Sequence, residues 1–205
     1  PLPRGWERDR PPRGFAFHSS FGCPTDCTFC CSPALTGRRW KAIPGDRLAD
    51  EIAALHERFR FDTLRFQDAN WGVAEKRAAE FCRGLVERGV DVHWNATIEI
   101  ETVVRYRAAT LDLLSDTDCT LLSLGAETRH IEIEDIPRAL GALYERGIVA
   151  GTFWIIGYPG EDAASMEATL RQAARVKLLF PGSASEVYPF RAIPGTEDWD
   201  AARAL

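Results

Sequence analysis

Short apolar runs alternate with longer amphipathic segments along most of the chain. The short runs are rich in β-branched and aromatic residues, as β-strands are. They span residues 14–19, 62–67, 91–96, 119–124, 151–156 and 185–190. Each of the first five precedes a segment whose apolar residues recur every three or four positions, which is the spacing of one helix face. Strands that alternate with helices in this way predict a parallel sheet joined by helical crossovers.

The helical segments are bounded by residues typical of helix ends. In the first, Leu48, Ile52 and Phe59 share a face, and Asp46 is the expected N-cap. The second is expected to stop at Gly89, because glycine commonly ends a helix. The apolar faces of the second to fifth helices lie within residues 78–85, 104–111, 136–143 and 166–173.

Six strands and their helices predict an α/β fold, either a doubly wound sheet or a full or partial barrel. In both architectures ligands bind at the carboxyl ends of the strands. These ends are rich in glycine, proline, carboxylate and amide groups, so the functional residues should lie there. We expect residues 14–205 to form one domain. Residues 1–13 combine proline with charge, and we expect a linker from an upstream domain there.

Composition narrows the class of protein. The 205 residues are 45% apolar, which is enough for one well-filled core. No apolar stretch approaches the length of a membrane-spanning helix, and 27% of the residues are charged. The net charge is −5 with interspersed signs, which argues against a nucleic-acid partner. No secretion signal opens the chain and its six cysteines are unevenly placed, so we expect a cytoplasmic protein without disulfides.

Four of the six cysteines lie in the segment FGCPTDCTFCCSP, and three chemistries compete for them. A disulfide is geometrically allowed but does not suit this class of protein. Structural zinc needs four ligands, and the set would have to be closed by Cys31 or His18. The third option is a four-iron cluster held by Cys23, Cys27 and Cys30 alone, with one iron open to another ligand.

The remaining cysteines have simpler interpretations. Cys31 is expected to point away from the other three, as the next residue along an extended backbone does. Cys82 and Cys119 lie among predicted core positions and read as small apolar residues.

The segment CPTDCTFC resembles the Cys-x3-Cys-x-aromatic-Cys motif of the radical S-adenosylmethionine enzymes. The strand–helix rhythm is similar to their partial (β/α)6 TIM-like barrel, and the resemblance covers nearly the whole chain. It implies that Cys23, Cys27 and Cys30 hold a four-iron, four-sulfur cluster, with Phe29 shielding one face. In that family the open iron binds S-adenosylmethionine, and one electron cleaves it to a 5′-deoxyadenosyl radical.

The resemblance also assigns residues to S-adenosylmethionine at the second strand. Asp68 and Asn70 stand in FQDAN, where the family contacts the amino group of the methionine moiety. The common Gly-Gly-Glu form of that motif is absent here. From the residues alone, a strand-terminal Asp followed by Asn is more often a helix cap or a turn than a ligand contact.

Two later strand ends complete the set of predicted contacts. In LGAET, Gly125 allows close backbone approach and Glu127 matches the ribose-binding position, although a buried salt bridge is its structural alternative. In FWIIGYPGE, Gly157 resembles the glycine that contacts adenine through its backbone, and Glu161 is expected to cap the next helix. No catalytic residue is assigned.

The order of the motifs is similar to the subgroup that carries a cobalamin-binding domain before the radical barrel. This resemblance implies a cobalamin-dependent methyltransferase, with a small-molecule substrate and an external electron donor of the flavodoxin or ferredoxin type. Alternatives are a hydrogen-abstracting radical enzyme without cobalamin and, from another class, a zinc-stabilised binding module. The segment that follows Glu127 is shorter than its counterpart in the family. The motifs leave the substrate unspecified.

Overall fold

The structure is a computed structural model that describes residues 13–127 and 131–204. The predicted linker, apart from Arg13, lies outside the described residues. So does the beginning of the short segment that follows Glu127.

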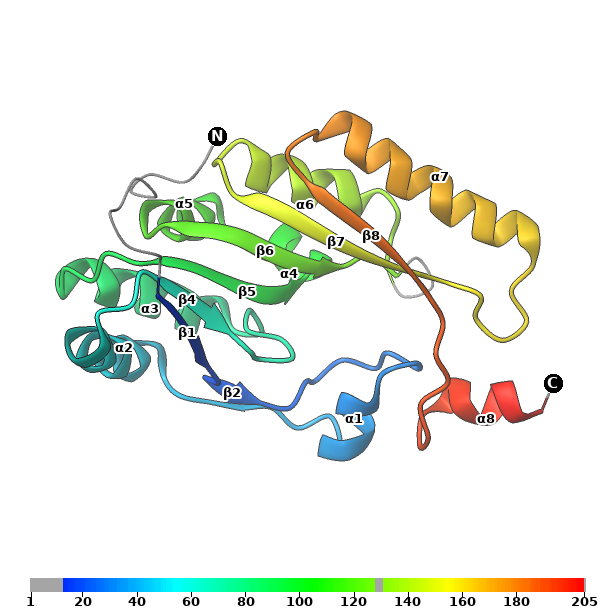
Figure 1. Cartoon of the computed structure of the whole chain (residues 1–205), viewed down its shortest axis with the longest axis horizontal. Coiled ribbons are helices and arrows are strands. Elements are labelled where there is room, and N and C mark those ends of the chain that lie inside the picture. The colour runs from blue at the N-terminus through cyan, green and yellow to red at the C-terminus, as the bar shows by residue number, and fades with distance from the viewer. Residues whose placement is uncertain (1–12, 128–130, 205) are drawn as a thin grey trace.

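Six parallel strands form the main sheet and confirm the predicted fold class (Figure 1). In sheet order they are β1 (Gly14–Phe17), β4 (Thr63–Phe66), β5 (His93–Glu99), β6 (Cys119–Gly125), β7 (Val149–Ile156) and β8 (Ala184–Pro189). Each strand pairs with the next in chain order, as successive strand–helix units of a barrel do. The strands β1 and β8 form the two edges, so the barrel is open.

Helices connect the strands. They are α2 (Gly45–Phe59), α3 (Glu75–Glu87), α4 (Ile100–Arg105), α5 (Ala108–Asp116), α6 (Asp135–Tyr144) and α7 (Ala163–Leu179). The N-cap of α2 is Pro44, and Asp46 lies inside the first turn, so the predicted N-cap was wrong by two residues. There Asp46 still places its negative charge at the positive end of the helix dipole.

The third predicted helix is two helices. The chain is extended at Tyr106 and Arg107, between α4 and α5. Instead of continuing the helix, the Arg107 amide donates to Glu75 Oε1 at 3.0 Å, and the Tyr106 hydroxyl donates to the Gly72 carbonyl at 2.7 Å. Long-range hydrogen bonds thus override a local pattern that favoured one helix.

Residues 19–43 leave the main sheet and carry Cys23, Cys27, Cys30 and Cys31, and we call this segment the excursion. The sequence did not predict its short strands or its helix. The excursion contains β2 (Ser20–Phe21), α1 (Cys31–Thr36) and β3 (Lys41–Ala42). The short strands β2 and β3 pair antiparallel, and the Ile43 amide donates to the Ser19 carbonyl at 3.0 Å. The chain therefore leaves and re-enters the fold at one place. Cys31 is the first residue of α1, so the extended backbone expected there is a helix start.

The core lies between the sheet and its helices. Alternate residues of β5 are fully buried there, whereas the intervening ones are half-buried and face the concave side of the sheet. The rings of Phe66, Trp71, Phe81 and Trp94 pack with centroids 5.0 to 5.9 Å apart. Burial of each such side chain contributes about 1.5–3 kcal/mol. This packing fixes the frame from which the strand ends project.

Candidate functional site

The loop that carries Cys23, Cys27 and Cys30 lies over the carboxyl ends of the strands. Its sulfur atoms have polar neighbours. Cys23 Sγ lies 3.0 Å from Thr25 Oγ1, and Cys27 Sγ lies 3.7 Å from the same hydroxyl. Cys30 is the N-cap of α1, where its Sγ accepts from the Ser32 amide at 3.4 Å. One threonine therefore links two of the sulfurs, and a helix start orients the third.

Burial makes these thiols reluctant to ionise in the metal-free chain. It raises the pKa of Cys27 from 9.0 to about 11, against the hydrogen bond from Thr25. Burial likewise raises the pKa of Cys30, and the charges of Cys31 and Cys23 add to it. A bound cation would reverse this cost, because metal ligation needs the thiolate and lowers its pKa. The site is thus suited to a group that brings positive charge.

A cavity of about 320 Å³ adjoins the loop on the side of the sheet, and we call it the inner cavity. Its acidic lining residues are Asp26, Glu99, Glu101 and Glu127. The other lining residues are Thr25, Cys27, Ile100, Gly125 and Ile131. The inner cavity therefore has the size of a small-molecule site. Among residues 13–127 and 131–204, no Lys, Arg or His side chain lines it.

Two of these carboxylates, Glu99 and Glu127, are electrostatically coupled. Burial raises the pKa of Glu127 from 4.5 to about 7, and the charge of Glu99 adds to the rise. Burial also raises the pKa of Glu99, and the neighbouring side chains of Thr25 and Asn70 oppose the rise. Within the described part of the chain, Asn70 Nδ2 is buried without a hydrogen-bond partner. Like charges that share a cavity favour a cationic ligand or a retained proton.

Glu127 and Gly125 are placed as the sequence predicted, at the end of β6. A Cβ added at Gly125 would lie 2.5 Å from Glu127 Oε2, so a larger residue there would displace this carboxylate. Glu99 was missed as a site residue, because the predicted third strand stopped at Ala96 whereas β5 runs on to Glu99. The alternation of Trp94, Ala96 and Ile98 continues through that end and could have revealed it.

The residues after β4 lie deeper. Asp68 is 3% exposed, and both its carboxylate oxygens accept hydrogen bonds from Ser19 and Ser20. Asn70 is 2% exposed, and its Oδ1 accepts from the Gly72 amide at 3.2 Å. Neither side chain lines the inner cavity. Their contacts with S-adenosylmethionine stay predictions.

The turn after β7 has the backbone that its sequence indicated. Gly157 has a φ of 82°, in the region that favours glycine. The expected helix cap at Glu161 was wrong. Asp162 is the N-cap of α7, whereas Glu161 closes the turn by accepting from the Gly157 and Tyr158 amides. A carboxylate that follows a tight turn satisfies the nearest free amides, which here belong to the turn.

Aromatic contacts join the cysteine loop to this turn. The Phe29 ring lies edge-on to Tyr158, with centroids 5.9 Å apart, and Tyr158 packs against Phe190 at 5.3 Å. Phe29 thus reaches across the strand ends of β7 and β8. Its predicted role as a cover for the cluster stays a prediction.

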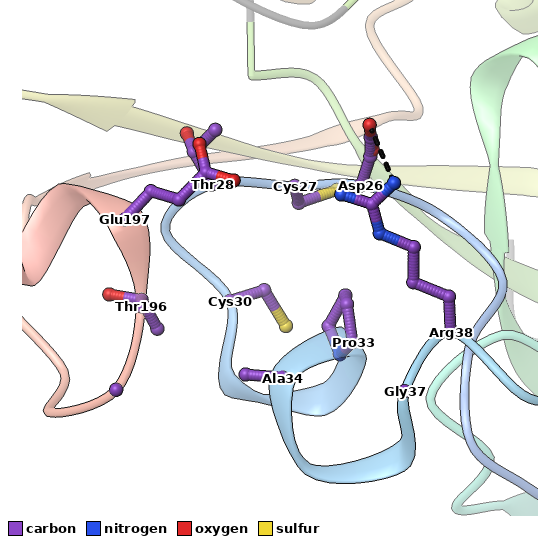
Figure 2. A pocket seen from close by; sticks show the side chains of 11 residues that line it. Asp26, Cys27, Thr28, Cys30, Pro33, Ala34, Gly37, Arg38, Thr196 and Glu197 are labelled. Atoms are coloured by element: carbon purple, nitrogen blue, oxygen red, sulfur yellow. Dashed lines mark ion pairs between the residues drawn. The ribbon is translucent and has the colours of Figure 1, made fainter.

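A second cavity, of about 370 Å³, lies on the other side of the loop, and we call it the outer cavity (Figure 2). Figure 2 shows Cys30 between Pro33 and Ala34 of α1 and Thr196 and Glu197 at the start of α8 (Glu197–Arg203). Cys27 lines both cavities, so the loop is the wall between them.

The C-terminal helix is tied to the cysteine loop. Thr28 Oγ1 donates to Asp198 Oδ2 at 2.8 Å, and the Asp198 amide donates to the Thr28 carbonyl at 3.2 Å. Figure 1 shows α8 close to α1, far from α6 and α7. Sequence analysis gave no role to Thr28 or Asp198, which lie 170 residues apart. No local pattern signals a contact over that distance.

Two of the alternatives for the cysteines lose support. All six are free thiols, so the disulfide interpretation was wrong. Among the described residues, no three His, Cys, Asp or Glu side chains are placed to hold one metal ion, as structural zinc would require. Ligands of a four-iron cluster bind different irons and need not converge on one point. Three thiolates can ligate three irons of such a cluster and leave the fourth iron open.

Known proteins resemble the chain in sequence and in fold. No family model matches it. An uncharacterized methyltransferase of Pyrococcus horikoshii is 25% identical over 196 residues, which cover 91% of this chain and 41% of that protein. The bacteriochlorophyllide d C-12(1)-methyltransferase of Chlorobaculum tepidum is 26% identical, over 87% of this chain and 43% of its own length. The chain spans about two fifths of these relatives.

Solved structures match the fold. TsrM of Kitasatospora setae, a radical S-adenosylmethionine methyltransferase solved with tryptophan and a S-adenosylmethionine analogue, superposes with a TM-score of 0.75 at 17% identity. The match covers 91% of this chain and 38% of TsrM. This fold places the Cys-x3-Cys-x2-Cys loop directly after the first strand, over the carboxyl ends of the others. The chain therefore has the fold of this radical S-adenosylmethionine methyltransferase.

A second TsrM structure, with a TM-score of 0.73, holds cobalamin and a 4Fe–4S cluster. This likeness agrees with the subgroup that the order of motifs indicated. Among the residues that the structure describes, no helix combines the length and apolar character needed to cross a bilayer.

Proposed function

We propose that the chain is the core of a radical S-adenosylmethionine methyltransferase. The carrying observation is that Cys27, one of three cysteines on the loop, lines the same inner cavity as Glu99 and Glu127. Cys23, Cys27 and Cys30 would hold a 4Fe–4S cluster. When bound, the cluster supplies the electron that cleaves S-adenosylmethionine to methionine and a 5′-deoxyadenosyl radical.

The residues of the chain would bind and orient S-adenosylmethionine. The inner cavity offers the carboxylates of Glu99 and Glu127 to a ligand that carries an ammonium and a sulfonium. We propose that Glu127 accepts from the ribose hydroxyls, with Gly125 keeping its carboxylate in place. Gly157 would contact adenine through its backbone. Phe29 would limit the access of water to the cluster.

Asn70 would act on the methionine end of S-adenosylmethionine indirectly, through Glu99. Its amide opposes the rise in the Glu99 pKa, so the two side chains share one electrostatic environment. We propose that Asn70 orients Glu99 toward the amino group of S-adenosylmethionine, since Glu99 lines the inner cavity and Asn70 does not.

Methyl transfer to a small biosynthetic intermediate is the finer proposal, and it rests on the named relatives. Both curated relatives described above are named methyltransferases, and TsrM was solved with cobalamin. Cobalamin would lie outside the chain described here and would carry the methyl group. An external one-electron donor of the flavodoxin or ferredoxin type would reduce the cluster. Such chemistry needs a reducing compartment, so we place the protein in the cytoplasm.

Anaerobic reconstitution with iron and sulfide tests the proposal. The reduced protein should give the electron paramagnetic resonance signal of a 4Fe–4S cluster, and S-adenosylmethionine should change its shape. A Cys23→Ala/Cys27→Ala/Cys30→Ala variant should lose the signal, whereas Cys31→Ala should keep it. A wild-type protein that binds no cluster, or whose signal is indifferent to S-adenosylmethionine, would refute the proposal.

A further inference from the structure

The two ends of the excursion lie side by side, and we call this pair of ends its base. The chain leaves the sheet at Ser19 and returns at Ile43, and the Ile43 amide donates to the Ser19 carbonyl at 3.0 Å. Because the cysteine loop lies between these two points, whatever fixes the base also fixes where the loop starts and ends.

Arg77 of α3 binds both sides of this base. Arg77 is 6% exposed. Its Nε donates to the Ile43 carbonyl at 2.8 Å, and its Nη2 donates to Ser19 Oγ at 2.5 Å and to the Ser19 carbonyl at 3.3 Å. Its Nη1 donates to the Trp71 carbonyl at 3.0 Å. One rigid, five-donor group thus joins both ends of the excursion to the segment after β4, which a lysine cannot do.

Aromatic rings hold the guanidinium in place. Arg77 Cζ lies 5.7 Å from the ring centroid of Trp40 and 5.5 Å from that of Trp71. Both distances are in the range of cation–π attraction. Burial lowers the pKa of Arg77, and the negative charge of Asp68 opposes that change. The buried charge is therefore compensated by one particular carboxylate.

Asp68 binds the first residues of the excursion. The Ser19 amide donates to Oδ1 at 2.7 Å, and the hydroxyls of Ser19 and Ser20 donate to Oδ2 at 2.5 and 2.7 Å. Since a hydroxyl has a single proton, Ser19 Oγ gives it to Asp68 and accepts from Arg77. The order Arg77, Ser19, Asp68 is a directed chain of charge-assisted hydrogen bonds.

The position of Asp68 separates it from the site. Asp68 is 3% exposed and lines neither the inner nor the outer cavity. Ser20 is three residues from Cys23, so the contacts of Asp68 act at the root of the loop.

We propose that Arg77, Ser19 and Asp68 form a clamp that positions the cysteine loop, and that Asp68 acts on S-adenosylmethionine only through this clamp. The three are positioning residues. The inference rests on the proposed function because it takes the loop to hold the cluster. The clamp itself belongs to the metal-free chain and can be tested there.

Hydrogen exchange of the metal-free protein is the first test. In Ser19→Ala and in Asp68→Asn, the amides of residues 20–43 should exchange about tenfold faster, because each variant removes a hydrogen bond to a charged group. The double variant should exchange no faster than Asp68→Asn alone, since the residues act in series. Lys76→Met, which changes an exposed neighbour of Arg77 on α3, should leave exchange unchanged.

Two substitutions test Arg77: Arg77→Lys keeps the positive charge, and Arg77→Met removes it. Arg77→Lys keeps the charge and loses the fork of donors, so it should speed exchange in residues 20–43 while leaving β6 and β7 protected. Arg77→Met should do the same to a larger extent. If Arg77→Met does not fold, Arg77→Lys and Ser19→Ala decide the outcome.

Binding of S-adenosylmethionine separates the clamp from a direct contact. The dissociation constant is measured by titrating the change in the paramagnetic signal of the reconstituted protein. With a clamp, Ser19→Ala and Asp68→Asn weaken binding equally, within about twofold. With a direct contact, Asp68→Asn weakens binding tenfold or more beyond Ser19→Ala.

The possible failures are distinguishable. If the wild-type protein binds no cluster, the proposed function fails, and the exchange experiment still decides the clamp. Unchanged exchange in Ser19→Ala, Asp68→Asn and Arg77→Lys would overturn the clamp even when the cluster forms. A selective loss of binding in Asp68→Asn would overturn it in favour of direct contact.

Discussion

Two regions of the molecule use cysteine in opposite ways. Cys27 and Cys30 lie on a loop between two cavities, with polar groups beside their sulfurs. Cys82 and Cys119 are buried in the core between α3 and the sheet. Burial raises the pKa of Cys27 to about 11 and that of Cys82 to about 12. A suppressed thiolate therefore does not distinguish the two regions.

The difference lies in access and neighbours. A ligand in either cavity can reach Cys27, so a cation there can compensate its thiolate. Cys82 has one polar neighbour, Thr117, but it lies in the apolar core and lines neither the inner nor the outer cavity, so it remains a small apolar residue. A cysteine can thus act as a ligand only where a cavity beside its sulfur admits a cation.

A Cys→Ala substitution in each region should have the largest effects and should separate the two roles of cysteine. Cys27→Ala should abolish cluster binding and leave the fold intact, because the loop is outside the core. Cys82→Ala should keep the cluster and lower the free energy of unfolding by about 1–2 kcal/mol through a small cavity. Iron content and urea unfolding measure the two effects. An iron-loaded Cys27→Ala protein would contradict the assignment.

Glycine at the root of the loop should matter nearly as much. Gly22 has a φ of 88°, and a Cβ there would lie 2.0 Å from the Arg39 carbonyl oxygen. Gly22→Ala should therefore displace the loop and at least halve the iron content, on top of about 1–2 kcal/mol of backbone strain. Gly89→Ala is the matched control, because Gly89 has a φ of 62° with nothing near its Cβ position. Similar iron content in both variants would show that the loop tolerates the displacement.

The stability of the protein should depend on pH through Glu127, the buried carboxylate of the inner cavity. The pKa of Glu127 is raised to about 7, so between pH 4.5 and 7 the folded chain keeps a proton that the unfolded chain loses. Its contribution to stability is complete below pH 4.5 and disappears as pH rises through 7. Between pH 5 and 8, metal-free wild type should lose about 2–3 kcal/mol more than Glu127→Gln.

Urea unfolding of the metal-free protein at both pH values measures this difference. Glu57→Gln is the control on an exposed carboxylate of α2 away from the cavity, and it should retain the decline. Equal slopes for wild type and Glu127→Gln would show that Glu127 titrates normally.

The tie between α8 and the loop should give the smallest effect. Thr28→Val removes the 2.8 Å hydrogen bond to Asp198 and should cost about 1 kcal/mol of stability. Hydrogen exchange should rise in residues 196–203 and remain unchanged in α6. Faster exchange throughout the sheet would mean that Thr28 supports more than this tie.

The sequence by itself determined the architecture and the position of the chemistry. Alternation and periodicity located all six strands of the main sheet, because each strand buries one face against helices and so repeats its apolar residues. The cysteine spacing marked the loop, and Gly125 and Gly157 marked two strand ends whose backbone needs glycine. These features are local, so a short stretch of sequence carries them completely.

Tertiary structure alone decided which side chains meet. The break between α4 and α5 depends on Glu75, and the tie of α8 depends on Thr28. Asp68 was expected at a ligand, yet its oxygens bind serines 48 and 49 residues earlier in the chain. The physical reason is common to all of them. A polar group takes the best partner that the fold brings near it, and that partner is set by packing of distant segments.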